Sequence, residues 1–375
     1  MNIIWLTKLT DKDPFRNTQL MMSDALRKHG NEVTLVLARN FAEKKEKHEG
    51  MVYLPTLDIK FLSGLLFGFI VFFSLPGLLK KKKIDIIFVS GDTIWSPFFL
   101  PIRFFGIPLI MDMRSLPIDS DMMKLKNSSL YLSRFLVDGV TTITPELAII
   151  LQKKFHFVDT PIGIWSSGFS KDQFRGVQQD LIDTAFKDKF VVMHHGTYSP
   201  SRGIEELIRA IPLVNDAVKK QIVLLLVGIP QEKIEDLRNL CQTLGISKLV
   251  TIIPPVEIKK IPSYIQQCDV GVIPLPPDNE WWHVSVPLKS LEYLAMGKPV
   301  IATSIPFHQK IFELCDCGVL LNTNKPEEIG RAIDFLYEQK EKLVDMGKKG
   351  REVVEKYYSW ESKALEVEEY LRQFV

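Results

Sequence analysis

Cysteine is scarce in this chain, which limits the kinds of site and compartment that the sequence allows. Four cysteines occur among the 375 residues, at Cys241, Cys268, Cys315 and Cys317. None shows the CxxC spacing of a zinc or redox site, and Cys315-x-Cys317 is a weak metal signal that two small buried thiols explain better. With no signal-peptide pattern at the N-terminus, this scarcity indicates a reducing, cytoplasmic location.

An excess of one charge is also missing from the chain as a whole. The 47 basic residues face 45 acidic ones, so the sequence gives no indication of a nucleic-acid partner. The balance hides an asymmetry, because residues 1–180 carry a net +5 and residues 181–375 a net −3. The basic excess lies largely in one run, Lys80, Lys81, Lys82 and Lys83, which follows an uncharged apolar stretch at 61–79.

What is present is a regular alternation of short apolar runs and helical patterns, which predicts an α/β fold with parallel sheets covered on both faces. The pattern restarts near residue 190, after a polar stretch at 174–189. We therefore expect two Rossmann-like domains, at 1–175 and 188–358, and a separate terminal helix at 359–375. Ligands of such sheets bind beyond the carboxyl ends of the strands.

The most informative stretch, residues 285–302, predicts a helix that enters from a binding edge. Ser285 is a candidate cap and Pro287 suits the first turn. The helix N-terminus would offer backbone N–H groups and a positive dipole end to a phosphate. Lys289 opposes that dipole unless an anion binds there, and Glu292 is placed to accept hydrogen bonds from a sugar diol. The alternative is a capped helix with a surface lysine and a solvated glutamate.

Together with the segments 195–203, 226–228 and 358–361, this stretch resembles the GT-B glycosyltransferases of family 4. The likeness covers nearly all of the second half, and the first half resembles the family more loosely, through 108–117 and 138–144. It implies two Rossmann-like domains facing across a cleft and a C-terminal helix that crosses back to the first domain. It also implies transfer of a sugar from a nucleotide-sugar with retention, without a metal or other cofactor.

The resemblance assigns the donor site residue by residue. The family holds the diphosphate with a basic pair, of which Arg202 is the second member, whereas Thr197 stands where the first would be. Lys289 is our candidate for the missing charge. The donor-binding residues expected on this basis are Gly196, Thr197, Arg202, Val256, Ser285, Leu288, Lys289 and Glu292.

Two further departures bear on the donor. Glu292 matches the second of the family's paired glutamates, but the first falls at Val284, and Asn279 or Glu280 is a possible substitute. Trp281 and Trp282 either stack on the ligand or simply pack. Where the family cradles the base by main chain, prolines at 254 and 255 leave only Val256 with an N–H group.

In the first half, Asp112 and Arg114 follow a predicted strand. Arg114 stands where some family members have a histidine, and it would stabilise negative charge on the diphosphate or the attacking oxygen. Asp112 would orient it or help to deprotonate the acceptor. A structural Asp–Arg pair is the alternative. The family's glycine-rich turn after the first strand is absent, and the loop at 13–17 takes its place.

The apolar stretch and its lysines, residues 61–83, allow three interpretations: a membrane span, a helix buried against the sheet, or a docking helix. The docking interpretation immerses Phe67, Phe72 and Phe73 and sets Lys80–Lys83 on anionic headgroups. Family members that glycosylate lipid-linked acceptors often carry such segments. A spanning helix would split the domain, so docking is the preferred interpretation.

The resulting expectation is a retaining glycosyltransferase, peripheral on the cytoplasmic face of a membrane, that builds a polysaccharide or glycolipid. Its partners would be a nucleoside-diphosphate sugar and a lipid-linked or glycan acceptor. A soluble transferase or GT-B epimerase is the alternative among enzymes. Because Thr197 and Val284 replace charged residues of the family, a non-catalytic nucleotide-sugar-binding or scaffold protein is the alternative outside them.

Overall fold

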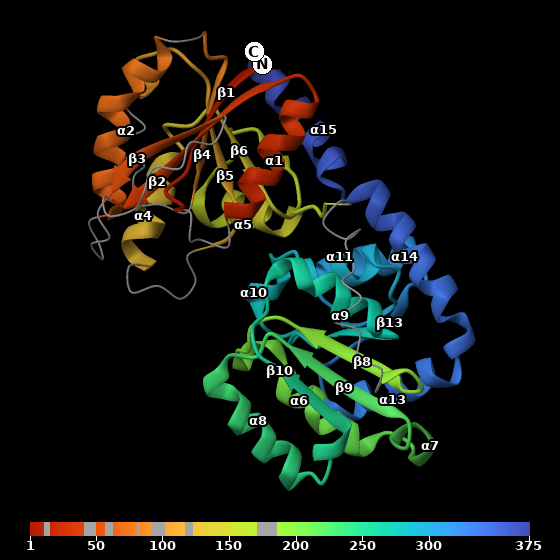
Figure 1. The fold of residues 1–375 in the computed structure, drawn as a ribbon. Coiled ribbons are helices and arrows are strands. Elements are labelled where there is room, and N and C mark those ends of the chain that lie inside the picture. The colour runs from red at the N-terminus through yellow and green to blue at the C-terminus, as the bar shows by residue number, and fades with distance from the viewer. Residues whose placement is uncertain are drawn as a thin grey trace. The chain divides into compact units, whose positions relative to one another are not determined.

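The computed structural model describes residues 1–10, 16–40, 50–56, 63–80, 83–91, 102–116, 123–170 and 186–375. The chain divides into two compact units (Figure 1). The first unit comprises Met1–Ser167 and Trp360–Val375, and the second comprises Gly168–Ser359. The C-terminal helix therefore belongs to the first unit, as the sequence predicts.

The first unit is built on a seven-stranded sheet in the order β3-β2-β1-β4-β5-β6-β7, in which every pair of neighbours is parallel. Its strands are β1 (Asn2–Leu6), β2 (Glu32–Asn40), β3 (Met51–Thr56), β4 (Ile86–Ser90), β5 (Leu109–Met113), β6 (Gly139–Thr142) and β7 (Ile162–Ile164). The parallel α/β architecture predicted from the alternating pattern is confirmed. The apolar runs at 3–6, 32–37, 84–90, 108–113 and 139–144 predict β1, β2, β4, β5 and β6, whereas the edge strands β3 and β7 have no such run to predict them.

The direction of each crossover decides which face of this sheet a helix covers, because βαβ connections are right-handed. The helices are α1 (Arg16–Lys28), α2 (Ser63–Leu79), α4 (Met123–Ser133), α5 (Pro145–Phe155) and α15 (Trp360–Leu371). The crossover through α1 runs toward the β3 edge, whereas those through α2, α4 and α5 run toward the β7 edge. Helices α2, α4 and α5 therefore share one face, and α1 lies on the other (Figure 1).

The core on the α1 face is closed by the end of the chain. Trp5 of β1 packs on Phe88, with ring centroids 4.6 Å apart, and on the edge of Trp165 at 6.2 Å. Side chains of α15, among them Trp360 and Leu371, are buried in this same cluster. The C-terminal helix thus supplies apolar surface that the first unit needs to bury its sheet.

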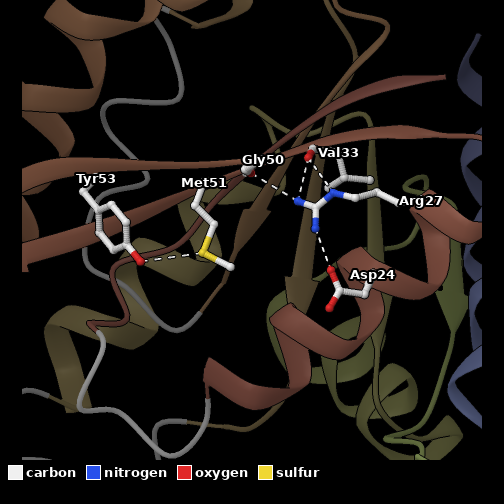
Figure 2. A network of polar contacts seen from close by, with 6 residues as sticks. All are labelled: Asp24, Arg27, Val33, Gly50, Met51 and Tyr53. Atoms are coloured by element: carbon white, nitrogen blue, oxygen red, sulfur yellow. Dashed lines mark hydrogen bonds and ion pairs between the residues drawn. The ribbon is translucent and has the colours of Figure 1, made fainter. Parts of the chain in front are cut away.

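A single arginine joins the first helix to two strands of the sheet (Figure 2). Arg27, in the last turn of α1, donates from Nη2 to the carbonyls of Val33 at 2.8 Å and Gly50 at 3.1 Å, and from Nη1 to Asp24 at 2.7 Å. Gly50, just before β3, has φ +73°, and a Cβ there would meet the guanidinium Cζ at 2.9 Å. The edge strand β3 is therefore held through a position that only glycine suits.

The second unit repeats the architecture with a six-stranded parallel sheet in the order β10-β9-β8-β11-β12-β13. Its strands are β8 (Phe190–His195), β9 (Ile222–Val227), β10 (Val250–Ile253), β11 (Val270–Ile273), β12 (Val300–Thr303) and β13 (Gly318–Leu321). Its longer helices are α6 (Ile204–Ala210), α8 (Gln231–Thr243), α9 (Ile261–Gln267), α11 (Leu288–Ala295), α12 (Pro306–Leu314), α13 (Pro326–Glu338) and α14 (Leu343–Tyr357), with short turns α7 (Asp216–Lys219), α10 (Glu280–His283) and the 3₁₀ turn η5 (Pro200–Arg202). The strand order reverses direction between β8 and β11, which is where such sheets bind ligands.

Helix α2 accounts for the described part of the apolar stretch. Phe67, Val71 and Leu75 recur at helical spacing and are buried, whereas Phe69 is 51% and Phe73 is 74% exposed. Phe67 is therefore a core residue, and the prediction that it is immersed in a membrane is wrong. Among the described residues, the helices all fall short of the length and apolarity that a bilayer crossing requires.

Candidate functional site

The chemistry-bearing residues of the second unit gather at the carboxyl ends of β8 and β11. Strand β8 ends at His195 and leads through Gly196 to the turn η5, while α10 and α11 follow β11. The two strands are parallel neighbours, so their carboxyl ends meet at one edge of the sheet. The topology thus places the η5 turn and the N-terminus of α11 beside the same point.

Lys289 crosses directly over Gly196. A Cβ at Gly196 would lie 2.8 Å from Lys289 Nζ, and this glycine has φ +114°, which L side chains rarely adopt. Burial and the charge of Arg202 lower the pKa of Lys289 to about 8, against the opposing effect of Glu292. A half-buried lysine beside an arginine is unfavourable unless an anion is present, so the arrangement suits a bound phosphate group.

Arg202 is held by a tryptophan on the opposite side of the loop. Trp282 of α10 donates from Nε1 to the carbonyl of Ser201 at 3.0 Å, and the Arg202 guanidinium lies 5.7 Å from the Trp282 ring centroid. Burial lowers the pKa of Arg202, yet an arginine stays charged at neutral pH. Of the two sequence interpretations, packing therefore describes Trp282, which fixes the turn that carries Arg202.

Glu292 lies one turn beyond Lys289 on α11. Its Oε2 is 3.2 Å from His195 Nε2, and its side chain is 26% exposed. Burial raises the pKa of Glu292, while Lys289 acts against that shift. Burial and the charge of Lys289 hold the pKa of His195 well below its usual range, so the imidazole is neutral and the contact is not an ion pair.

Helix α11 is fixed to the sheet by two buried polar contacts. Tyr293 donates its hydroxyl to the carbonyl of Met193 at 3.0 Å. Ser290 Oγ lies 2.8 Å from His308 Nε2, whose Nδ1 lies 2.7 Å from the carbonyl of Thr303. A carbonyl only accepts, so Nδ1 carries the proton and Ser290 donates to Nε2. These contacts fix where Lys289 and its helix N-terminus point.

The sequence prediction for the helix cap was wrong. Helix α11 begins at Leu288 with Pro287 at the cap position, and Ser285 instead donates to the carbonyl of Trp281 at 2.6 Å. Leu288 itself is 43% exposed. The first turn of α11 therefore lacks a side-chain cap among the described residues, which leaves its N–H groups to water or a ligand.

The other predicted donor residues take different environments. Thr197 is exposed and Val256 half-buried, whereas Val284, which replaces the family's first glutamate, is buried. Of its two proposed substitutes, Asn279 already accepts a hydrogen bond from the backbone of Trp281 at 3.0 Å as the cap of α10, and Glu280 is exposed.

Sequence reasoning assigned no role to the two histidines that end β8. His194 Nδ1 lies 2.8 Å from the carbonyl of Val272, which fixes the proton on that nitrogen. Burial, Lys289 and Arg202 lower the pKa of His194 to about 3. The signal that could have found these residues is their place at the carboxyl end of the strand next to the reversal of strand order.

The predicted catalytic pair of the first unit has structural partners. Arg114 donates to the carbonyl of Trp165 and to Ser167 Oγ, both at 2.9 Å, and stacks 3.8 Å above the Trp165 ring. Burial lowers the pKa of Arg114 to about 10, partly opposed by Asp112. Asp112 is buried and accepts from Thr141 Oγ1 at 2.8 Å. These contacts fit a structural role, and the catalytic roles stay predictions.

The described residues bring no cluster of three or more metal-ligating side chains together. Cys241, Cys268 and Cys317 are buried and Cys315 is half-buried, all as free thiols. Of the basic run, Lys80 and Lys83 are exposed, and Lys81 and Lys82 lie outside the described residues. Phe72 is half-buried against Phe73, with ring centroids 5.1 Å apart.

Comparison with known proteins agrees with this geometry. Residues 179–353 match the family model of the group 1 glycosyl transferases, and residues 17–173 match the model of glycosyltransferase family 4. A GDP-mannose-dependent alpha-(1-6)-phosphatidylinositol monomannoside mannosyltransferase of Mycobacterium tuberculosis is 25% identical over 174 residues, 46% of this chain and 45% of that protein. A D-inositol 3-phosphate glycosyltransferase of an Arthrobacter species is 24% identical over 269 residues, 66% of this chain and 60% of that protein. The chain thus spans about half the length of the first of these relatives.

Solved structures show the same fold over the whole chain. Sucrose-phosphate synthase of Thermosynechococcus elongatus has a TM-score of 0.76 at 17% identity, covering 100% of this chain and 99% of that one. HepE of Anabaena, in complex with UDP, has a TM-score of 0.73 at 15% identity and 100% coverage of both chains. The two units therefore form a GT-B fold, and with both halves matched by family models, the chain belongs to the group 1 glycosyltransferases of family 4.

Proposed function

We propose that this protein transfers a sugar from a nucleoside-diphosphate donor, with retention and without a metal, to a lipid-linked or glycan acceptor at a membrane surface. The observation that carries the proposal is that Lys289, in the uncapped first turn of α11, lies over Gly196 and near enough to Arg202 for that charge to lower its pKa. Lys289 supplies the positive charge that the family places at Thr197. Two cations and a helix dipole together match the charge of a diphosphate leaving group.

Glu292 and His195 complete the donor site. The half-exposed Glu292 carboxylate accepts hydrogen bonds from a sugar diol, and the neutral ring of His195, 3.2 Å away, limits where that carboxylate can turn. Because Lys289 and Glu292 lie on one face of α11, one turn apart, the same helix binds the diphosphate and the ribose. The protein then contributes mainly orientation and stabilisation of the departing charge.

The acceptor and the membrane are supported by other observations. The relatives named above include enzymes whose names give a phosphatidylinositol mannoside or an inositol phosphate as acceptor. On α2, Phe69 and Phe73 are exposed, and Lys80 and Lys83 follow with exposed side chains. Exposed rings next to cations suit an anionic lipid surface.

The donor experiment incubates the protein with UDP- and GDP-sugars and a membrane lipid extract, with and without EDTA. We expect transfer from one donor, unchanged by EDTA, and loss of at least about 99% of the rate in Arg202→Ala and Glu292→Ala. Arg209→Ala is the control, because Arg209 is an exposed arginine of α6 that pairs with Glu205 one turn away. Transfer that ignores both substitutions contradicts the proposal. Nucleotide binding without turnover identifies a binding protein. Conversion of the donor to its epimer, without transfer to an acceptor, identifies an epimerase.

The membrane part is tested by flotation with vesicles. The double variant Phe69→Ser/Phe73→Ser removes two exposed rings, and we expect it to lower the bound fraction several-fold. The control is Phe335→Ser/Tyr357→Ser, which removes rings that are 45% and 40% exposed on the second unit. Equal binding by wild type and the α2 variant contradicts a docking role for α2.

A further inference from the structure

Helix α4 of the first unit buries one large apolar side chain, Leu130, together with two serines. Ser129 and Ser133 are buried, and Ser133 Oγ donates to the carbonyl of Ser129 at 2.9 Å. Beside the exposed Lys124 and Ser128, the exposed side chains on α4 and just after it are large and apolar: Met123 is 47% exposed, Leu125 45%, Tyr131 39%, Leu132 48% and Phe135 66%. A surface helix of a soluble domain normally shows the opposite arrangement, so this face is expected to be covered by an apolar partner.

Cations outnumber acidic residues on and beside this face. Helix α4 and the residues up to 137 contain no acidic residue, and the cations of this region are Lys124, Lys126, Arg134, Lys153 and Lys154. Lys153 and Lys154 lie in the last turn of α5, whose one acidic residue, Glu146, is in the first turn. Nearby Asp138 pairs with Arg103. Apolar side chains among cations complement an anionic phospholipid surface.

Between α4 and α5 the surface is hollowed. The hollow has a volume of about 480 Å³ and is lined by Asn127, Ser128, Tyr131, Leu132, Lys154 and Phe155. It combines an amide, a hydroxyl and a cation at its rim with two aromatic rings. Two neighbours contact the Tyr131 ring. The Arg134 guanidinium carbon lies 3.9 Å from its centroid, and the centroid of the His156 ring lies 5.9 Å from it. These groups match the phosphate and glycerol of a lipid headgroup.

We infer that α4 and α5 form a second membrane contact, in which the exposed side chains of α4 enter an anionic bilayer and the hollow receives one phospholipid headgroup, with its phosphate on Lys154. The inference extends the membrane part of the proposed function from α2 to its neighbours. The topology supports it, because α2, α4 and α5 cover the same face of the sheet.

The test uses the full chain and vesicles of phosphatidylcholine with and without phosphatidylglycerol, at low and high salt. Lys154→Glu is expected to lower the partition coefficient on anionic vesicles roughly tenfold, since reversing one charge changes two charge units near the surface. Lys153→Glu makes the same charge change outside the hollow and is expected to cost no more than about threefold. Lys340→Glu is the control on the second unit, where the lysine lies 5.3 Å from a ring as Lys154 does at 5.6 Å.

A second variant, Leu132→Ser/Phe135→Ser, keeps every charge and is expected to lower binding to both kinds of vesicle. Equal losses for Lys154→Glu and Lys153→Glu overturn the headgroup site. Wild-type binding by all α4 and α5 variants, with loss in Phe69→Ser/Phe73→Ser, overturns this inference and leaves the proposed function standing. Binding of UDP and GDP, measured on every variant, should stay unchanged, which separates the lipid surface from the donor site.

Discussion

The two units share a parallel sheet covered by crossover helices, but they place their unusual side chains differently. In the second unit they are half-buried charges gathered at one edge of the sheet, Lys289 and Glu292 above all, whose pKa values are shifted by burial. In the first unit they are large apolar side chains that lie outside, such as Phe73 and Phe135. Charged side chains are usually exposed and large apolar side chains usually buried, so these exceptions point to the function of each unit. We propose that the first set binds an anionic small molecule and that the second meets an apolar surface.

The largest expected effect comes from removing the charge of Lys289 in the second unit. Lys289→Met should weaken binding of UDP or GDP by roughly 30-fold or more, about 2 kcal/mol, because a charge-assisted contact to the diphosphate is lost. Titration calorimetry measures it. Lys233→Met, which removes an exposed lysine paired with Asp236, is the control. Wild-type affinity in Lys289→Met would show that Arg202 alone holds the anion.

Gly196→Ala should have the next largest effect. The new Cβ would displace Lys289 and would also force an alanine to φ +114°, and we expect an affinity loss of about tenfold. Gly245→Ala separates the two causes, since Gly245 has φ +68° and open space around it. It should cost stability without changing nucleotide affinity. Equal affinity losses in both variants would contradict the close approach of Lys289.

Gly50→Ala tests the first unit alone. It should lower the free energy of unfolding by about 1–2 kcal/mol, because it strains φ and pushes Arg27 from the carbonyls that it holds. Gly30→Ala is the control for strain, with φ +83° and nothing within 4 Å. Thermal unfolding measures both. Weaker nucleotide binding by Gly50→Ala would contradict the expectation that this position affects the first unit alone.

The smallest effect concerns pH. A bound diphosphate favours the charged form of Lys289 and raises its pKa, so affinity is full below the free-state pKa of about 8 and falls as the pH rises through it. Between pH 7 and pH 8.5 the charged fraction falls about fourfold, and affinity should follow. Lys289→Arg should flatten this profile. A wild-type affinity that rises over this range would contradict a protonated Lys289 in the complex.

Much of the second unit could be predicted from the sequence, for a physical reason. Its strands and helices have clear apolar patterns bounded by glycine and proline. These patterns predict strands at 190–195 and 270–274 and a helix at 287–296, and β8, β11 and α11 match them to within one residue at each end. The cap predicted at Ser285 does not form, because α10 lies just before it and the Ser285 hydroxyl donates to the carbonyl of Trp281 instead. The sequence alone does not show which of several backbone groups a serine hydroxyl will bond.

The first unit was harder to predict because its signals are short or uniform. The strand β3 contains Pro55 and β7 has three residues, so neither stands out as a strand. Helix α2 is apolar on all sides, and periodicity therefore could not tell Phe67, which is buried, from Phe73, which is not. Helix α4 buries Leu130 but exposes most of its other large apolar residues, so its apolar pattern does not show which face packs on the sheet.

The assignment of Trp360–Val375 to the first unit has a consequence for biosynthesis. The chain leaves the ribosome from its N-terminus, and domains tend to fold as they emerge. The second unit, Gly168–Ser359, is contiguous and complete once its last residue is out. The first unit must wait for α15, whose Trp360 and Leu371 close its core. The second unit would then be native while the core on the α1 face of the first unit is still open.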